Sequence, residues 1–166
     1  MNVAASSDSL QTLVVIGNGM VGHHCVEQLV ARGALERYRI HVFCEESRRA
    51  YDRVHLSEYL NGRDAESMAL GEASLYAQEG VSLHLGVPVL EIDRRRREIV
   101  TASGRSAYDK LILATGSYPF VPPIVGAEGA SRLVYRTLDD LDLIREAAHG
   151  ARRGVVVGGG LLGLEA

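Results

Sequence analysis

The sequence contains few of the residues on which disulfide scaffolds and thiolate metal sites depend. Its 166 residues include no tryptophan and only two cysteines, Cys25 and Cys44. Two cysteines so placed form neither a CxxC pair nor a thiolate cage for a metal, and they do not suggest a disulfide scaffold. We interpret both as small buried apolar residues of a protein that works in a reducing compartment.

An excess of basic charge is also absent. The chain carries 18 lysines and arginines against 21 aspartates and glutamates, which gives a formal net charge of −3 and a pI of about 6.1. Such a chain has little with which to neutralise a phosphate backbone, so we expect no nucleic acid partner. The four arginines of residues 94–97 have no aromatic residues among them, and a solvated hairpin turn is favoured over a phosphate-binding patch.

Long hydrophobic runs are missing as well. No segment approaches the roughly 20 apolar residues of a membrane-spanning helix. The longest apolar run, residues 154–166, is interrupted by glycines and contains Glu165. Residues 1–12 lack the basic and apolar regions of a secretion signal, so we interpret them as a flexible leader and expect a cytoplasmic protein with no membrane partner. The six histidines share no metal-ligand spacing, and we expect no metal site.

What the sequence does contain is an alternation of strand-length apolar runs with helical spacing, which predicts an α/β fold. Residues 13–16 are typical of a buried parallel strand, residues 20–32 have helical spacing, and residues 39–44 resemble a second strand. Strand, helix and strand in this order form a βαβ unit, which requires a parallel sheet. Further strands are expected at 81–85, 110–115 and 154–157, helices near 57–60 and at 72–79 and 137–149, and an antiparallel meander from Val87 through the Ser103–Gly104 turn.

Residues 17–22, which read Gly-Asn-Gly-Met-Val-Gly, fit the GxGxxG fingerprint of dinucleotide-binding turns. Gly17 permits the tight turn out of the strand, Gly19 lets the backbone approach a pyrophosphate, and Gly22 lets helix and strand pack closely. The free N–H groups and the positive dipole at the helix start would hold the phosphate charge. Glu45 lies 23 residues beyond Gly22, near the spacing of a carboxylate that binds ribose hydroxyls and repels a 2′-phosphate, which favours NAD or FAD over NADP.

A second segment, residues 158–165, carries the same fingerprint after the strand expected at 154–157. Gly158, Gly160 and Gly163 occupy the three glycine positions. Because two fingerprints imply two nucleotide sites, the sequence favours a flavoenzyme with FAD at the first site and a nicotinamide donor at the second. We therefore expect a leader at 1–12, a Rossmann-like FAD-binding module with an inserted meander at 13–150, and the truncated start of a nicotinamide-binding module at 151–166.

Several segments resemble the FAD- and NAD-linked reductases that carry two dinucleotide-binding modules. Residues 108–116 resemble the segment of those proteins that passes near FAD, and residues 136–140 resemble their entry into the nicotinamide module. More specifically, the chain is similar to the N-terminal part of the large subunit of the assimilatory NAD(P)H nitrite reductase family, over nearly its whole length after residue 12. The segments that carry this resemblance are residues 15–23, 42–46, 50–57, 113–123, 134–137 and 154–165.

The resemblance implies particular contacts with FAD. Glu45 would bind the adenosine ribose, the backbone of Val89 would face the adenine, and Arg53, Ser57 and Arg136 would steady the cofactor. Related ferredoxin-type reductases often have a lysine where Glu58 stands, so this position receives no role. The expected cofactor-binding residues are Gly17, Asn18, Gly19, Met20, Gly22, Glu45, Arg53, Ser57, Val89, Thr115, Gly116, Arg136, Gly158, Gly160, Gly163 and Glu165.

The resemblance also implies a reaction, which is hydride transfer from NADH or NADPH to FAD, with electrons then passed on one at a time. In the resembled family they travel through iron–sulfur and siroheme centres to nitrite. We expect those centres only in downstream domains, since this chain has no cysteine cluster to bind them, and we expect no catalytic side chain here. Because the chain stops at Ala166, we expect a fragment that binds FAD weakly and does not turn over NAD(P)H alone.

Two alternatives remain open at the level of sequence. One is a flavoprotein of the ferredoxin- or rubredoxin-reductase type, which would deliver electrons to a small redox partner. The other is a non-catalytic nucleotide-binding module, which would retain adenine nucleotide but no flavin.

Overall fold

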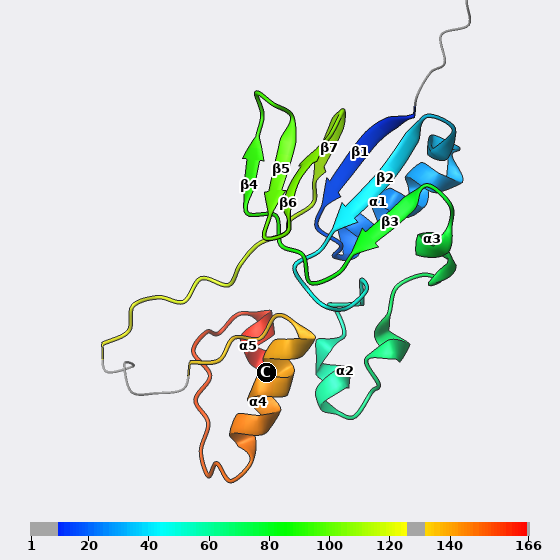
Figure 1. Cartoon of the computed structure of the whole chain (residues 1–166). Coiled ribbons are helices and arrows are strands. Elements are labelled where there is room, and N and C mark those ends of the chain that lie inside the picture. The colour runs from blue at the N-terminus through cyan, green and yellow to red at the C-terminus, as the bar shows by residue number, and fades with distance from the viewer. Residues whose placement is uncertain (1–9, 126–131, 166) are drawn as a thin grey trace, which may run out of the picture. The chain divides into compact units, whose positions relative to one another are not determined.

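A parallel four-stranded sheet forms the centre of the first of two units into which the chain divides (Figure 1). The structure is a computed structural model that describes residues 10–125 and 132–165, so most of the leader expected at 1–12 lies outside the described residues. Within these limits the first unit comprises residues 10–50 and 70–116, and the second comprises residues 51–69, 117–125 and 132–165. Each unit has its own apolar core.

The strands of the parallel sheet run in the order β3, β2, β1, β7. Their bounds are β1 Gln11–Ile16, β2 Tyr38–Phe43, β3 Val81–His84 and β7 Lys110–Leu113. Valine and isoleucine fill most of the buried positions of β1 and β2, because branched side chains pack well on a pleated surface. The burial of β1 from Leu13 to Ile16 confirms the buried parallel strand expected at 13–16.

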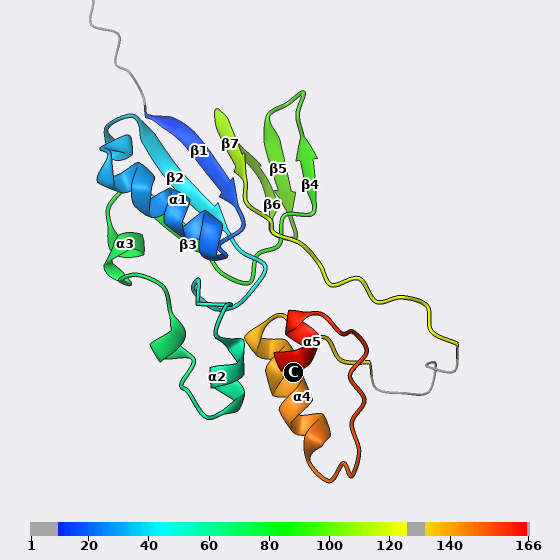
Figure 2. The ribbon, with the colours of Figure 1, turned by 180° about the vertical axis from the view of Figure 1, so that it is seen from behind.

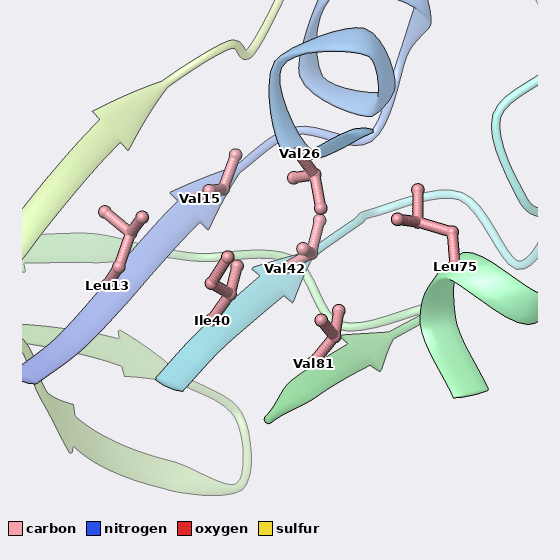
Figure 3. Close-up of a cluster of buried hydrophobic side chains, with 7 residues drawn as sticks. All are labelled: Leu13, Val15, Val26, Ile40, Val42, Leu75 and Val81. Atoms are coloured by element: carbon pink, nitrogen blue, oxygen red, sulfur yellow. The ribbon is translucent and has the colours of Figure 1, made fainter. Parts of the chain in front are cut away.

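Helix α1 (Met20–Ala31) covers one face of this sheet, as Figure 2 shows from behind. Its fully buried Val26 belongs to the same cluster as Val15 and Val42 of the sheet (Figure 3). The helix ends before Gly33, whose φ of 76° is a left-handed conformation that glycine adopts without strain. The short elements η1 (Ala34–Glu36) and α3 (Ser74–Ala77) complete this layer. The βαβ unit predicted from the sequence is therefore confirmed.

An antiparallel meander covers the other face of the parallel sheet. Its strands are β4 Glu91–Asp93, β5 Glu98–Thr101 and β6 Gly104–Ala107, paired in chain order. Ile99 of β5 is fully buried and packs in one cluster with Val14, Ile16 and Phe43 of the parallel sheet. The antiparallel meander expected from the sequence is therefore confirmed. It packs on the parallel sheet through the apolar cluster around Ile99.

The second unit is helical. It contains α2 (Leu56–Leu60), η2 (Glu66–Met68), α4 (Leu138–Ala148) and α5 (Leu161–Glu165). Its core gathers Tyr51, Leu56, Met68, Leu138 and Leu141, which come from segments far apart in the sequence. Helix α4 begins at a capping box, in which the Asp140 N–H donates to Thr137 Oγ1 and the Thr137 N–H donates to Asp140 Oδ2. The helix expected at 137–149 is thus confirmed, with Thr137 as its N-cap.

The segment 51–69 enters and leaves the second unit at neighbouring points. The Asp52 N–H donates to the carbonyl of Met68 over 2.9 Å, and Tyr51 and Ala69 form an isolated antiparallel bridge. Just outside this segment, the Leu70 N–H donates to the carbonyl of Ala50 over 2.8 Å. These contacts bring together the two ends of the inserted segment.

The strand expected at 154–157 is wrong. Val155, Val156 and Val157 form no strand and are exposed. A strand is stable only when its N–H and C=O groups have partners, and no strand within residues 10–125 and 132–165 pairs with this segment. The run has the apolar, branched composition of a strand, but composition does not supply a neighbour.

Three smaller expectations need correction. The helix expected at 72–79 is only the single turn α3, because Gln78 adopts an extended ψ of 140° before the turn at Gly80. Val87 and Val89 lie outside the strands of the meander, since Pro88 between them has no N–H for a ladder. Cys44 is buried as expected, whereas Cys25 is only partly buried.

Candidate dinucleotide-binding edge

The register of the parallel sheet brings the ends of three strands together. Ile16 of β1 is aligned with Phe43 of β2 and with Leu113 of β7. Beyond these positions the Gly17 N–H donates to the carbonyl of Phe43, and the Ala114 N–H donates to the carbonyl of Ile16, each over 2.8 Å. Segments that follow the three strands therefore leave the sheet at one edge, here called the carboxyl edge. Ligands of open parallel sheets bind at such edges.

Residues 17–22, here called the first glycine turn, link β1 to α1 at the carboxyl edge. Gly17 has a φ of 104°, and a Cβ on it would overlap the backbone of Ala114. A Cβ on Gly22 would overlap the carbonyl of Gly17. A Cβ on Gly19, in contrast, would meet nothing within 4 Å. The first and third glycines are thus required by packing, and the second faces open space, as a glycine beside a ligand would.

In the described part of the chain, neither a capping side chain nor an acidic residue of the first turn compensates the positive end of α1. Its N-cap is Gly19, which has no side chain to accept from the first N–H groups, and the first turn contains no acidic residue. Unsatisfied N–H groups and the helix dipole together favour an anion at this place. The geometry therefore fits a phosphate-bearing ligand.

A buried polar network lies directly beneath the first glycine turn. Tyr76 of α3 donates its hydroxyl proton to Asn18 Oδ1 over 2.7 Å, and the same hydroxyl lies 2.8 Å from His23 Nδ1. Asn18 is 3% exposed, and its Nδ2 has no hydrogen-bond partner in the described part of the chain. Burial lowers the pKa of His23 and raises the pKa of Tyr76 to about 12.

Sequence reasoning did not connect this network to the turn. Of the two adjacent histidines after the turn, His23 is buried in this network and His24 is exposed. Tyr76 was not singled out, because it lies 58 residues from Asn18 in the chain. The one available signal was an aromatic residue with a hydroxyl group in the helical segment expected at 72–79.

Other expected site residues also follow strands at the carboxyl edge. Glu45 is exposed two residues after β2, and Thr115 and Gly116 are exposed just after β7. Val89 lies on the connection to the meander, where its side chain packs with the cluster around Ile99. The expected residues that lie in this first unit are Gly17, Asn18, Gly19, Met20, Gly22, Glu45, Val89, Thr115 and Gly116.

The second glycine turn, residues 158–163, repeats the glycine geometry of the first in the second unit. Gly158 has a φ of 132°, and a Cβ on Gly163 would overlap the carbonyl of Gly158. A Cβ on Gly160 would meet nothing within 4 Å. The second and third positions thus behave as in the first turn, and the positive φ of the first position recurs, but a Cβ on Gly158 would meet nothing within 4 Å, unlike one on Gly17. The turn here follows an extended segment with no partner strand among the described residues.

Ser57 and Glu165 are the two expected site residues that contact each other in the second unit. Ser57 donates its hydroxyl proton to Glu165 Oε1 over 2.6 Å. Burial and the nearby charge of Glu165 raise the pKa of Tyr135. The guanidinium groups of the two expected arginines lie over tyrosine rings, Arg53 over Tyr51 and Arg136 over Tyr118.

Histidines occur in one further pair, on adjacent strands. His41 Nδ1 lies 3.3 Å from His84 Nε2, and the ring of His84 also stacks on Phe43. Within residues 10–125 and 132–165 no three His, Cys, Asp or Glu side chains are grouped so as to hold a metal ion. In the same part of the chain, no helix combines the length and the apolar character that crossing a bilayer requires. A hollow lined by Leu10, Arg39 and Gly80 lies at the opposite, amino edge of the sheet, away from the glycine turn.

Comparison with known proteins finds matches over nearly the whole chain. The family model for Pyridine nucleotide-disulphide oxidoreductase matches residues 11–166. The nitrite reductase (NAD(P)H) large subunit of Klebsiella oxytoca is 57% identical over 155 residues, which are 93% of this chain and 16% of that protein. The nitrite reductase (NADH) large subunit of Escherichia coli (strain K12) is 48% identical over 155 residues, which are 93% of this chain and 18% of that protein. This chain therefore spans only a small part of the length of these curated relatives.

Solved structures show the same likeness. The crystal structure of the ferredoxin reductase for the CYP199A2 system from Rhodopseudomonas palustris matches with a TM-score of 0.81 and 30% identity. The match covers 93% of this chain and 38% of that one.

Proposed function

We propose a function for a chain that belongs to the Pyridine nucleotide-disulphide oxidoreductase family: it is the FAD-binding portion of an NAD(P)H-dependent flavoprotein oxidoreductase of the nitrite reductase large-subunit type. The observation that carries the proposal is the first glycine turn. Its outer glycines are fixed by packing, its middle glycine faces open space, and it leads into a helix whose amino end is uncompensated.

The residues of the first unit fit the adenosine diphosphate half of FAD. The N–H groups around Gly19 and Met20 would bind the diphosphate, and the exposed Glu45 would accept from the ribose hydroxyls. The backbone of Val89 would face the adenine. Thr115 and Gly116, exposed at the same edge, would approach the diphosphate from the β7 side.

Residues of the second unit would complete the binding of cofactors. Arg53, Ser57 and Arg136 would steady FAD, and the second glycine turn with Glu165 would begin the NAD(P)H site. Glu58, which stands where ferredoxin-type reductases often have a lysine, forms an ion pair with Arg63. This ion pair supports our proposal that the Glu58 carboxylate has no role in binding the flavin.

Bound FAD would supply the redox chemistry, by accepting a hydride from NAD(P)H and releasing electrons singly toward nitrite through iron–sulfur and siroheme centres outside this chain. The chain's own residues bind and orient the cofactor. The partners we propose are nucleotide cofactors with downstream redox domains or a small redox protein, in the cytoplasm. The module boundaries we propose remain 13–150 for FAD and 151–166 for the start of the NAD(P)H site.

A matched pair of glycine substitutions tests this function. Gly19→Ala places a methyl group where the structure has open space, so it should fold normally while it obstructs the approach of a diphosphate. Gly154→Ala, which also meets nothing within 4 Å, is the control. Purified wild-type chain reconstituted with FAD should absorb near ~450 nm after desalting and quench flavin fluorescence, and we expect an FAD affinity about tenfold or more lower for Gly19→Ala alone.

The same assay separates the alternatives. A chain that binds ADP but retains no flavin is a non-catalytic nucleotide-binding module, and the proposal is then wrong. Equal FAD affinity for Gly19→Ala and wild type also contradicts it. The likeness to the Rhodopseudomonas palustris structure supports a second candidate, a ferredoxin reductase. A ferredoxin reductase would bind FAD in the same way and would differ from the proposed function only in the electron acceptor.

A further inference from the structure

The asparagine of the first glycine turn is held by Tyr76, which His23 contacts in turn, and the fingerprint includes neither residue. Asn18 Oδ1 accepts from the Tyr76 hydroxyl over 2.7 Å, and that hydroxyl is 2.8 Å from His23 Nδ1. His23 lies on the first turn of α1 and Tyr76 on α3, so the network fastens the turn to two helices. Nothing in the GxGxxG pattern requires either side chain.

The hydrogen bonds of this network run in one direction. A tyrosine hydroxyl has one proton, and Tyr76 gives it to Asn18 Oδ1 because the other atom of that amide, Nδ2, is itself a donor. The hydroxyl oxygen then accepts from His23, which must carry a proton on Nδ1. Burial favours the neutral form of both rings, since it lowers the pKa of His23 and raises the pKa of Tyr76.

Packing leaves this arrangement little freedom. His23 is 4% exposed, and a Cβ on Gly71 would overlap its ring, so backbone from the segment before α3 covers the imidazole. Tyr76 packs against the apolar cluster of the parallel sheet. These contacts hold both rings in place, and the Asn18 amide lies with its oxygen toward Tyr76.

The consequence is a buried amide donor with no acceptor. Asn18 is 3% exposed, and its Nδ2 has no partner among the described residues. Buried donors of this kind are rare, because water that solvated them in the unfolded chain is lost without replacement. Asn18 directly precedes Gly19, the uncompensated N-cap of α1, where an anion is favoured. An oxygen of a ligand bound there would be an acceptor for Nδ2.

We propose that the Asn18 side-chain amide donates a hydrogen bond to an oxygen of the bound dinucleotide, and that Tyr76 and His23 are positioning residues that turn this amide toward the ligand. The proposal rests on the proposed function, since it requires that a dinucleotide binds at the first glycine turn. It extends that function to side chains outside the fingerprint.

The composition of the chain allows a direct test. There are only three asparagines, Asn2, Asn18 and Asn61, so selective ¹⁵N labelling of asparagine side-chain amides gives three pairs of NMR signals. The variants Asn2→Ala and Asn61→Ala remove the other two pairs and assign the Asn18 pair without a change at the site. On titration with FAD, one proton of the Asn18 pair should shift downfield while the Asn61 pair stays in place.

The positioning residues are tested with a matched tyrosine pair. Tyr76→Phe should shift the Asn18 signals already in the free protein and weaken FAD binding about fivefold to tenfold, as expected for a donor that is no longer oriented. The control is Tyr38→Phe, because Tyr38 packs against the same apolar cluster and no hydrogen bond of its hydroxyl occurs among the described residues. It should change neither the Asn18 signals nor the FAD affinity.

The outcomes are distinguishable. If the wild-type chain binds no FAD, both the proposed function and this inference are wrong. If it binds FAD while the Asn18 signals do not move, or if Tyr76→Phe binds FAD like Tyr38→Phe, the inference alone is wrong. The titration of the wild-type chain decides even if Tyr76→Phe does not fold, since it needs no substitution at the site.

Discussion

At the scale of single residues, the third glycine of each turn is fixed by the carbonyl of the first. We predict that Gly22→Ala destabilises the first unit by about 1–3 kcal/mol, because the new methyl group must displace backbone at Gly17. Gly163→Ala should act in the same way on the second unit, where Gly158 takes the place of Gly17. Urea unfolding measures the loss, and Gly19→Ala should unfold like wild type. A stable Gly22→Ala would show that the turn is less tightly packed than described.

The paired histidines of β2 and β3 predict a dependence of stability on pH. Burial lowers the pKa of His41, with a further contribution from His84 and from Arg39, and burial lowers the pKa of His84. The unfolded chain, whose histidines titrate near ~6.5, then binds more protons than the folded chain just below that pH. The stability that these residues confer is therefore present above about pH 6.5 and lost as the pH falls through the lowered values.

Urea unfolding at pH 7.5 and at pH 5.5 checks this. The double variant His41→Gln/His84→Gln should lose part of the difference in unfolding free energy between the two pH values. The variant His24→Gln, which changes an exposed histidine, should keep the wild-type difference. An unchanged difference in the double variant contradicts the prediction.

Single residues also show where sequence reasoning stops. The glycines of both turns were predicted because their roles depend on spacing along the chain. The contact of Asn18 with Tyr76 was not predicted, because it joins residues 58 positions apart and is fixed only when α3 packs beside α1. The contact of Ser57 with Glu165 spans 108 positions and was missed for the same reason, although both residues had been selected as candidates.

At the scale of elements, the helix with the clearest sequence signal is α4. Thr137 and Asp140 form both hydrogen bonds of the capping box at its start. We predict that Thr137→Ala costs about 1 kcal/mol of stability, because two N–H groups lose their acceptor or its alignment. Urea unfolding measures this, and Leu143→Ala, at an exposed position of α4, is the control that should change stability little. An equal loss of unfolding free energy in Thr137→Ala and Leu143→Ala would show that the cap makes no measurable contribution to stability.

Strands were predicted correctly where a neighbouring strand pairs with them, and incorrectly where no such neighbour is described. Strands β1, β2, β3 and β7 pair with one another, and the expected apolar runs at these places are strands. Residues 154–157 have an equally apolar sequence but no pairing neighbour among the described residues, and they form no strand. Local composition therefore predicts the capacity for strand formation, whereas a sheet neighbour decides the outcome.

At the scale of the whole molecule, the two units have separate cores and should respond separately to damage. Leu141 is fully buried in the second unit, and Leu141→Ala should remove about 2–5 kcal/mol from the stability of that unit. Hydrogen exchange followed by mass spectrometry should then show faster exchange in α2 and α4, with β1 and β2 unchanged. Ile99→Ala, at a fully buried position of the first unit, should give the reverse pattern. Uniform acceleration in either variant would show a single cooperative core.

The two ends of the segment 51–69 lie side by side, so a short linker can take the place of this segment. Its entrance and exit are held in register by the Asp52 to Met68 and Leu70 to Ala50 backbone hydrogen bonds. A chain that ends at Gly116 and carries two or three glycine and serine residues between Ala50 and Leu70 would retain the first unit alone, without strain on β2 or α3. Such a chain would show whether the carboxyl edge, with Asn18, binds a nucleotide without the second unit.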